Sequence, residues 1–390
     1  MMASLFARTN RSQLAQWWWT VDRGMLASLM ALIAFGIALV ITASPSVAIR
    51  IKLDPTHFMV RHIIVIIPTI MIMLAVSMLN HRNIRRLGTI ICAIGIGLMM
   101  IIPFVGIDIK GAQRWIHVPG FSLQPSEFIK PAFAIVAAWL IAYQKRVTTF
   151  PGYILCAGLY VVVVGLLMIQ PDFGMTMVVT CMFAAQIFMA GLPFRYLTIL
   201  IALVAVGATG VYFTFDHVRS RFDRFLDPTS GDTFQIDKSL DAFANGGLFG
   251  TGPAQGTISH TIPDAHADFI FSVAGEELGL IFSLVIVGLY FFILMRGFNR
   301  LMESNDMFVV LAVGGILSMF GLQAFVHMGS SLHLLPTKGM TLPFISYGGS
   351  STLSMGFAMG VVLGLTRRDV RTSIARGGLS LSSRRVTGTP

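Results

Sequence analysis

The sequence predicts an all-α membrane protein with about ten transmembrane helices. Of its 390 residues, 55% are hydrophobic and only 12% are charged, which is far too apolar for a soluble domain whose surface faces water. Windows of about 19 residues resolve ten separate apolar stretches. They cover residues 25–43, 58–79, 88–106, 128–143, 153–169, 175–193, 197–215, 269–295, 308–328 and 346–365.

The distribution of Lys and Arg predicts which side of the membrane each loop occupies. Ten crossings put both termini on one side, and basic residues near membrane segments are retained in the cytoplasm. With both termini cytoplasmic, seventeen of the 28 Lys and Arg residues lie on that side and nine lie in the outer loops. We therefore explain the net charge of +10 by topology and by attraction to anionic membrane lipid, and expect no nucleic-acid partner.

One polytopic membrane domain accounts for most of the chain. We expect a cytoplasmic N-terminal segment at 1–24, the membrane domain at 25–366 and a disordered cytoplasmic tail at 367–390. Two outer loops, 107–127 and 216–268, have room for more than a turn. The longer one lies between helices 7 and 8 and mixes charge, aromatic residues and glycine, so we expect it to fold against the bundle.

The sequence lacks the motifs of several common enzyme classes. It contains no Gly-Lys pair of a phosphate loop and no HExxH, GxSxG or CxxC motif. The glycines of GTGPAQG, at 250–256, resemble a dinucleotide fingerprint only superficially, because no strand precedes them. We expect no organic cofactor.

The first outer loop gathers cations near one membrane surface. Lys110 and Arg114 lie in the loop, and Lys130 follows in the next apolar stretch. Glu127 is three residues before Lys130, so on a helix the two side chains share a face and can neutralise one another. An unpaired charge there would cost about 2.5 to 3.5 kcal/mol. Either a carboxylate partner or a bound phosphate group would balance the charge of Lys130, and the sequence does not decide between them.

Two further loop segments carry charge at outer membrane boundaries. In QPDFG, Asp172 stands where it would cap the next helix. The long loop opens with Arg219, Arg221 and Arg224, on the side that normally avoids basic residues. Binding of an anionic partner such as lipid phosphate would explain these three arginines.

The long loop closes with HTIPDAHADFIF, in which Asp268 stands at the mouth of an apolar helix. A partly desolvated carboxylate is a better base than an exposed one. A helix N-cap is the equally weighted alternative for Asp268. Glu276 and Glu277, two turns further on, need partners as well.

The last outer loop, LPTKGMTLPFISYGGSS at 335–351, contains Lys338, two prolines and three glycines. Lipid cannot satisfy the amides of irregular backbone. We therefore expect a re-entrant or tightly turned segment that faces a cavity.

The ordered motifs GAQRW, QPSE, QPDFG, GGLFGTG, PDAHADFIF with GEELG, and LPTKGMTLPFISYGGSS resemble the SEDS family (shape, elongation, division and sporulation) over nearly the whole chain. These are multi-spanning peptidoglycan glycosyltransferases of bacteria. The LPTKG version resembles the cell-division branch, since the elongation branch typically has Pro-Val-Thr-Gly there. One departure is Ala267, where the family usually has Thr.

The resemblance implies that the chain polymerises lipid II at the division septum, with the active site facing the periplasm and release of undecaprenyl pyrophosphate with inversion. Asp268 matches the family's essential acidic residue, and Mg²⁺ or Mn²⁺ would assist at the pyrophosphate. The implied partners are the nascent glycan, a class B penicillin-binding protein (the septal transpeptidase, FtsI type), other division proteins and membrane lipid. The candidate substrate-binding residues are Lys110, Arg114, Lys130, Lys338, Glu127 and Ser346.

Two other functions remain open at this point. A lipid II flippase without catalysis would use the same intramembrane charges to shield a headgroup. A scaffold that only recruits division proteins would tolerate neutralisation of Lys110 and Lys338.

Overall fold

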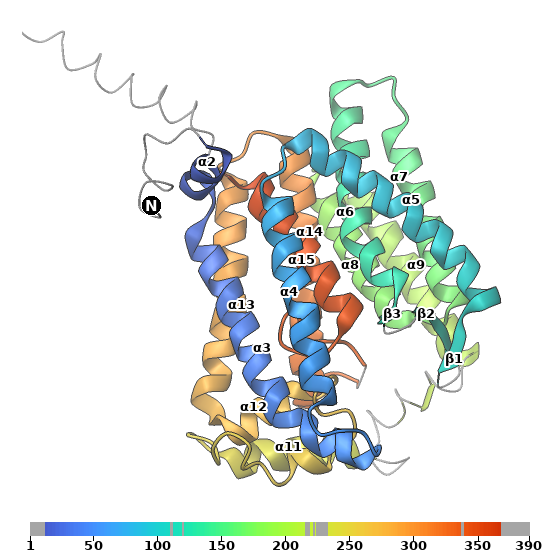
Figure 1. Cartoon of the computed structure of the whole chain (residues 1–390). Helices are drawn as coiled ribbons and strands as arrows, with labels where there is room; N and C mark the ends of the chain where they lie inside the picture. Colours follow the sequence, from blue (N-terminus) through green and yellow to red (C-terminus); the bar gives the residue numbers. More distant parts are fainter. Residues whose placement is uncertain are drawn as a thin grey trace, which may run out of the picture.

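The computed structural model describes residues 12–109, 112–118, 121–214, 219–220, 223, 233–336 and 339–367. Within these ranges the chain is a bundle of long helices (Figure 1), so the predicted helical membrane class is confirmed. Among the described residues, seven helices are long and apolar enough to cross a membrane. They are α3 (Arg23–Arg50), α4 (His57–Ser77), α5 (His81–Val105), α6 (Pro125–Arg146), α7 (Gly152–Ile169), α13 (Gly279–Met302) and α14 (Met307–Ser331).

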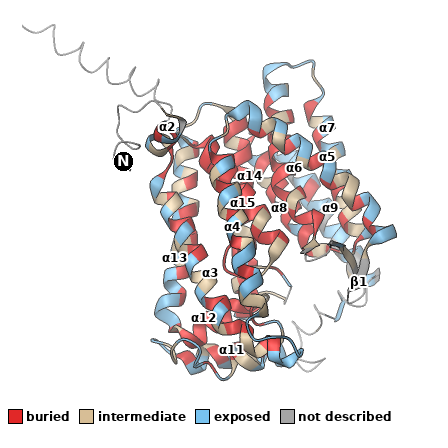
Figure 2. Cartoon of the chain, in the orientation of Figure 1, coloured by how far each residue is buried: buried red, intermediate tan, exposed pale blue. Residues whose placement is uncertain are grey.

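Three further apolar helices coincide with the remaining predicted stretches. They are α8 (Phe173–Met189), α9 (Phe194–Thr214) and α15 (Gly349–Leu365). The core is formed by α6, α14 and α15: the apolar window of α6 is 83% buried, against 22% in α7. Figure 2 shows the contrast between these buried helices and peripheral ones with one exposed face. The peripheral exposed faces suit contact with lipid.

One end of the bundle is tied together by the beginning and end of the described chain. The helix α2 (Gln13–Thr20) meets the end of α4, where Trp17 Nε1 donates to Ser77 Oγ at 2.8 Å. At the start of α3, Asp22 accepts from Arg296 and Arg300 of α13. Just after α15, the Arg367 guanidinium donates to the Leu79 carbonyl at 3.1 Å. Both ends of the described bundle therefore lie at the same pole.

The opposite pole carries the two long loops, and one of them contains strands. The segments β1 (Ile107–Ile109), β2 (Ala112–Val118) and β3 (Phe121–Leu123) form an antiparallel sheet in that order. The prediction of a purely helical chain is wrong here because the loop contains strands, and the predicted loop 107–127 ends earlier because α6 already begins at Pro125. The strands β1 and β3 have only three residues each, and β2 (AQRWIHV) does not alternate strictly between apolar and polar residues, so the sequence shows no strand period.

The predicted span at 269–295 is broken into two helices. A short helix, α12 (Ile270–Glu277), precedes α13, and Gly279 between them has a φ of +78°. A Cβ on Gly279 would lie 2.3 Å from the backbone nitrogen of Gly250. The first turn of α13 also donates backbone hydrogen bonds to carbonyls at 247 and 248. The membrane span therefore starts at Gly279, and the preceding helix belongs to the loop pole.

The long loop folds against the bundle as expected, within its described part. It contains α11 (Phe234–Gly246) and the 3₁₀ helix η2 (Ser259–Thr261). Ser239 of α11 contacts Ser272 of α12 at 2.5 Å and donates to the Ser331 carbonyl of α14 at 2.6 Å. Figure 1 shows α11 and α12 at the pole opposite α2.

Candidate active site

Asp268 lies in the turn that leads into α12, and it is half-buried. Its backbone nitrogen donates to the Asp264 carbonyl at 2.9 Å. The N-cap residue of α12 is Phe269, one position later. The N-cap alternative for Asp268 is therefore wrong.

The carboxylate of Asp268 lies against the LPTKG segment. A Cβ built on Gly339 would stand 3.2 Å from Asp268 Oδ2 and 3.5 Å from Oδ1. The glycine therefore allows the backbone of the last outer loop to approach the carboxylate closely. The structure thus brings together two of the motifs that the sequence separates.

An aromatic cluster holds these two segments in register. Tyr347, at the far end of the LPTKG loop, donates its backbone N–H to the His266 carbonyl at 2.9 Å. The His266 ring lies 4.5 Å from the Phe58 ring of α4 and 5.1 Å from the Tyr347 ring. Burial lowers the pKa of His266 to about 4, despite an opposing contribution from Asp264. At neutral pH His266 is therefore uncharged and acts as a packing group beside Asp268.

The predicted pairing of Glu127 with Lys130 is confirmed. Lys130 Nζ lies 2.8 Å from Glu127 Oε2, and both side chains are almost fully buried. The ammonium also donates to Gln323 Oε1 of α14 at 2.9 Å. Glu127 and Gln323 thus meet the charge and hydrogen-bonding demand of Lys130, as a charge inside the bundle requires.

The same network reaches the last outer loop. Gln323 Nε2 donates to the Thr341 carbonyl at 3.1 Å, and Thr341 Oγ1 contacts Ser351 Oγ at 2.6 Å. On the other side of the pair, Ser354 of α15 donates to the Glu127 carbonyl at 2.7 Å. The buried ion pair is therefore connected through Gln323 to the loop that carries Gly339.

The expected tight turn of the last loop is confirmed. Ser346 Oγ accepts from the Leu342 backbone N–H at 2.8 Å, and Ser346 is 1% exposed. Tyr290 of α13 donates to the Pro343 carbonyl at 2.5 Å. The Leu342 N–H and the Pro343 carbonyl are thus satisfied inside the protein, as irregular backbone away from water requires.

Arg114 clamps a different part of the same pole. It projects from β2, and its guanidinium donates to the carbonyls of Gln170 and Pro171 while Nε lies 3.8 Å from Asp172 Oδ2. Asp172 caps α8 through the Met175 N–H, so the cap prediction is confirmed. The Arg114 side chain remains 31% exposed and can still meet a ligand.

Several candidate residues lie outside the described ranges. These are Lys110, Lys338, Arg221 and Arg224. Of the three loop arginines, Arg219 is described, and it pairs with Asp223 at 3.6 Å. The site that can be built from described residues therefore centres on Asp268, Gly339 and the contacts that hold them.

Glu276 organises the loop in front of the site, a role that the sequence did not reveal. Its carboxylate accepts from the backbone N–H groups of residues 257, 258 and 259 at 2.7–3.0 Å. Asn245 Nδ2 adds a fourth bond at 2.8 Å. This carboxylate therefore fixes the path of the chain that returns toward Asp268. In the sequence, the only indication of this role was an acidic residue within an apolar stretch, where it needs partners.

Two glycines of the 246–256 segment, Gly246 and Gly250, allow close backbone packing. A Cβ on Gly246 would lie 2.1 Å from the Gly275 carbonyl oxygen, and one on Gly250 would lie 2.2 Å from the Glu277 carbonyl oxygen. The backbone N–H groups of Thr251 and Gly252 donate to residues 276 and 277 of α12. Packing against α12 therefore accounts for Gly246 and Gly250 of the GGLFGTG motif.

The described residues form no preformed cage for a divalent metal, because no group of three or more His, Cys, Asp or Glu side chains gathers in this part of the chain. Mg²⁺ at a phosphate is commonly held by one or two carboxylates together with the phosphate oxygens. Assistance by Mg²⁺ or Mn²⁺ at the pyrophosphate therefore stays a prediction.

Comparison with known proteins assigns the family. The FtsW, RodA and SpoVE family model, described as "Cell cycle protein", matches residues 23–370. A protein of Caulobacter vibrioides named "Probable peptidoglycan glycosyltransferase FtsW" is 43% identical over 364 residues, covering 93% of each chain. A Coxiella burnetii protein of the same name is 32% identical, covering 88% of this chain and 96% of its own.

Two solved structures share the fold. One, described as "Structural coordination of polymerization and crosslinking by a peptidoglycan synthase complex", superposes with a TM-score of 0.74 at 27% identity, covering 89% of this chain and 97% of its own. The Thermus thermophilus rod shape determining protein RodA gives a TM-score of 0.66 at 26% identity, covering 90% and 97%. The resemblance drawn from the motifs is confirmed, and this integral membrane protein belongs to the SEDS family that includes FtsW, RodA and SpoVE.

Proposed function

We propose that the protein is a peptidoglycan glycosyltransferase that polymerises lipid II into glycan strands at the division septum. The observation that carries the proposal is the Asp268 carboxylate held against Gly339 at the loop pole of the bundle. The FtsW relatives are named for this class of transfer, which supports it.

In the proposed reaction Asp268 is the general base. It takes the proton of the 4-hydroxyl of one GlcNAc, whose oxygen forms a bond to the anomeric carbon of MurNAc on another glycan. The bond from that carbon to the phosphate oxygen breaks, and undecaprenyl pyrophosphate leaves with the electron pair. Attack opposite the leaving group inverts the anomeric centre.

Cations near the loop pole would stabilise the charge that develops on the pyrophosphate. We propose Lys110, Arg114 and Lys338 for this contact. Lys130, Glu127 and Ser346 are buried, so we propose that these three support the walls of the substrate site. The Gln323 bridge to Thr341 is the physical basis for that division of roles.

The proposed topology has ten crossings, cytoplasmic termini and a periplasmic active site in the inner membrane. The domain limits remain 1–24, 25–366 and 367–390. The same-pole position of α2 and the end of α15 supports this topology. The arginine-rich contacts at that pole agree with the retention of basic residues in the cytoplasm.

We further propose a class B penicillin-binding protein as partner, with other division proteins around it. The structural relative described as a synthase complex couples polymerisation to cross-linking, which supports this pairing. The partner's outer domain would cross-link the strand that Asp268 extends.

Purified protein with that partner, given labelled lipid II in detergent, tests the function directly. No translocation is possible there, so ladders of glycan strands identify a polymerase. Absence of ladders, together with transport of lipid II across vesicle membranes, would establish the flippase alternative.

Replacement of Gly339 by Ala should lower polymerisation about tenfold or more. The new methyl group would crowd the Asp268 carboxylate at 3.2 Å, and a displacement of about 1 Å at a reacting group costs up to about 100-fold. The rate of ladder formation is the measurement.

Gly288→Ala is the matched control, because nothing lies within 4 Å of a Cβ at that helical position. Its activity should stay near that of the unaltered protein. Equal rates for the Gly339 and Gly288 variants would refute the contact with Asp268 as a determinant of activity.

A further inference from the structure

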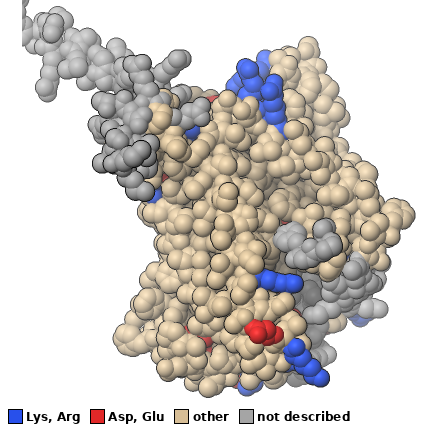
Figure 3. Space-filling model, in the orientation of Figure 1, with Lys and Arg blue, Asp and Glu red and all other residues tan. Residues whose placement is uncertain are grey.

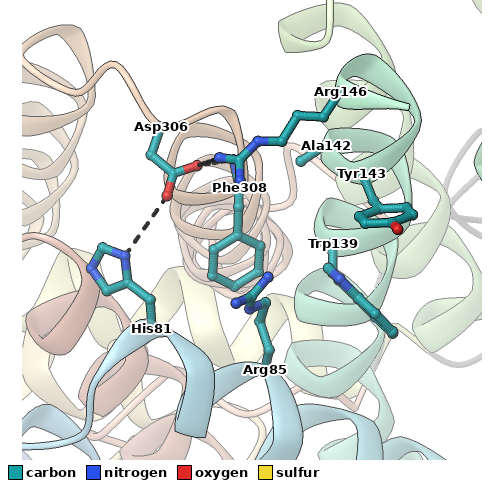
Figure 4. Close-up of a pocket in the computed structure, with 8 residues that line it drawn as sticks. All are labelled: His81, Arg85, Trp139, Ala142, Tyr143, Arg146, Asp306 and Phe308. Carbon is teal, nitrogen blue, oxygen red and sulfur yellow. Dashed lines mark hydrogen bonds and ion pairs between the residues drawn. The ribbon is translucent and has the colours of Figure 1, made fainter. Parts of the chain in front are cut away.

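A basic cleft lies at the pole opposite Asp268, and the proposed reaction does not use it. It is formed where α5 begins, α6 ends and α14 begins (Figure 4). A hollow of about 230 Å³ shares two lining residues with this cleft and is lined by Arg82, Arg85, Arg86, Thr89 and Trp139. Figure 3 shows Lys and Arg side chains gathered at this end of the molecule.

The acidic side chain of the cleft is already engaged. Asp306 lies 3.1 Å from Arg146 and 3.8 Å from His81 (Figure 4). Arg85 places its guanidinium 5.5 Å from the centre of the Phe308 ring. Within the described ranges, no carboxylate stands at ion-pair distance from Arg82, Arg85 or Arg86. The cleft therefore holds an excess of positive charge around an open space.

The hollow continues into an apolar surface that suits acyl chains. Arg82, Arg86, Ile90 and Ile94 follow one another at intervals of four residues, so they form one row along α5. The isoleucines are 55% and 57% exposed, which is expected of a helix face in contact with lipid. Trp139 of the neighbouring helix lines the basic part, where an amphipathic ring fits the membrane interface.

We propose that this cleft binds an anionic phospholipid, with its phosphate among Arg82, Arg85 and Arg86 and its acyl chains along Ile90 and Ile94. Basic pockets between membrane helices are suited to such headgroups. An acidic segment of a soluble protein would match the charge but not the apolar row below it. A lipid matches both, so the lipid is the occupant that the row of side chains favours.

Native mass spectrometry of the purified full chain tests the site, with phosphatidylglycerol and phosphatidylcholine as the two probes. The test variant carries Arg82→Gln and Arg86→Gln, both at exposed positions. The control carries Arg23→Gln and Arg195→Gln, which remove two exposed arginines from the same pole. Each basic residue near an anionic headgroup contributes about fivefold to affinity.

We expect the test variant to bind phosphatidylglycerol about 25-fold more weakly, with phosphatidylcholine binding unchanged and the control variant unaffected. Equal losses of phosphatidylglycerol affinity in both variants would refute the site, because they would show attraction by the overall positive charge of this pole. Full displacement by inorganic phosphate, or by an oligoglutamate peptide, would overturn it in favour of a free anion or a protein segment. None of these outcomes depends on glycan polymerisation.

Discussion

Replacement of Asp268 by Asn is expected to reduce glycan polymerisation by about 10²- to 10⁴-fold, the usual contribution of a positioned general base. Asparagine keeps the shape of the side chain and removes only the ability to take the proton. The close approach of Gly339 is preserved, so the backbone of the site should not move. Ladder formation from labelled lipid II gives the rate, and thermal unfolding in detergent checks that the variant is folded.

Asp264→Asn provides the control within the same loop. Asp264 is exposed and has a φ of +54°, a conformation that asparagine tolerates well. This variant should retain most of the activity, since it removes a carboxylate four residues from the proposed base and keeps the backbone carbonyl that accepts from the Asp268 N–H. An undiminished rate of polymerisation by Asp268→Asn would refute the assignment of Asp268 as the general base. An equal loss from Asp264→Asn would point to loop structure instead of proton transfer.

Replacement of Lys130 by Met is expected to destabilise the folded protein by about 3 to 5 kcal/mol, because it leaves the Glu127 carboxylate buried without its counter-charge. The Lys130 side chain is 0% exposed, so water cannot replace the lost partner. Thermal or denaturant unfolding in detergent measures the change. The Gln323 link implies that the LPTKG loop loosens in the same variant.

The pair of Lys238 with Asp241 is a matched control, because it has the same three-residue spacing and a similar distance of 3.0 Å. Its side chains are 36% and 54% exposed, so Lys238→Met should cost at most about 1 kcal/mol. A double variant, Lys130→Met with Glu127→Gln, should recover much of the lost stability, because no buried charge is then left alone. Similar losses at Lys130 and Lys238 would contradict the buried-pair interpretation.

The sequence was sufficient to predict those structural features that depend only on residues close together in the chain. The apolar stretches match membrane helices because a backbone in lipid must satisfy its own hydrogen bonds, and a helix does so within one segment. The pairing of Glu127 with Lys130 follows from helical spacing, and the cap at Asp172 from its place before α8. The turned LPTKG loop follows from its glycines and prolines.

Tertiary structure alone decided the features that join distant parts of the chain. The break at Gly279 exists because the backbone of Gly250 packs there, and the meeting of Asp268 with Gly339 arises because two loops converge at one pole. The three-stranded sheet was missed because two of its strands have only three residues and β2 does not alternate strictly between apolar and polar residues. Hydropathy and helical spacing are properties of one segment and determined the helical membrane class and most of the spans. Which loop contacts which depends on packing between segments, so only the folded chain placed Asp268 against its neighbour.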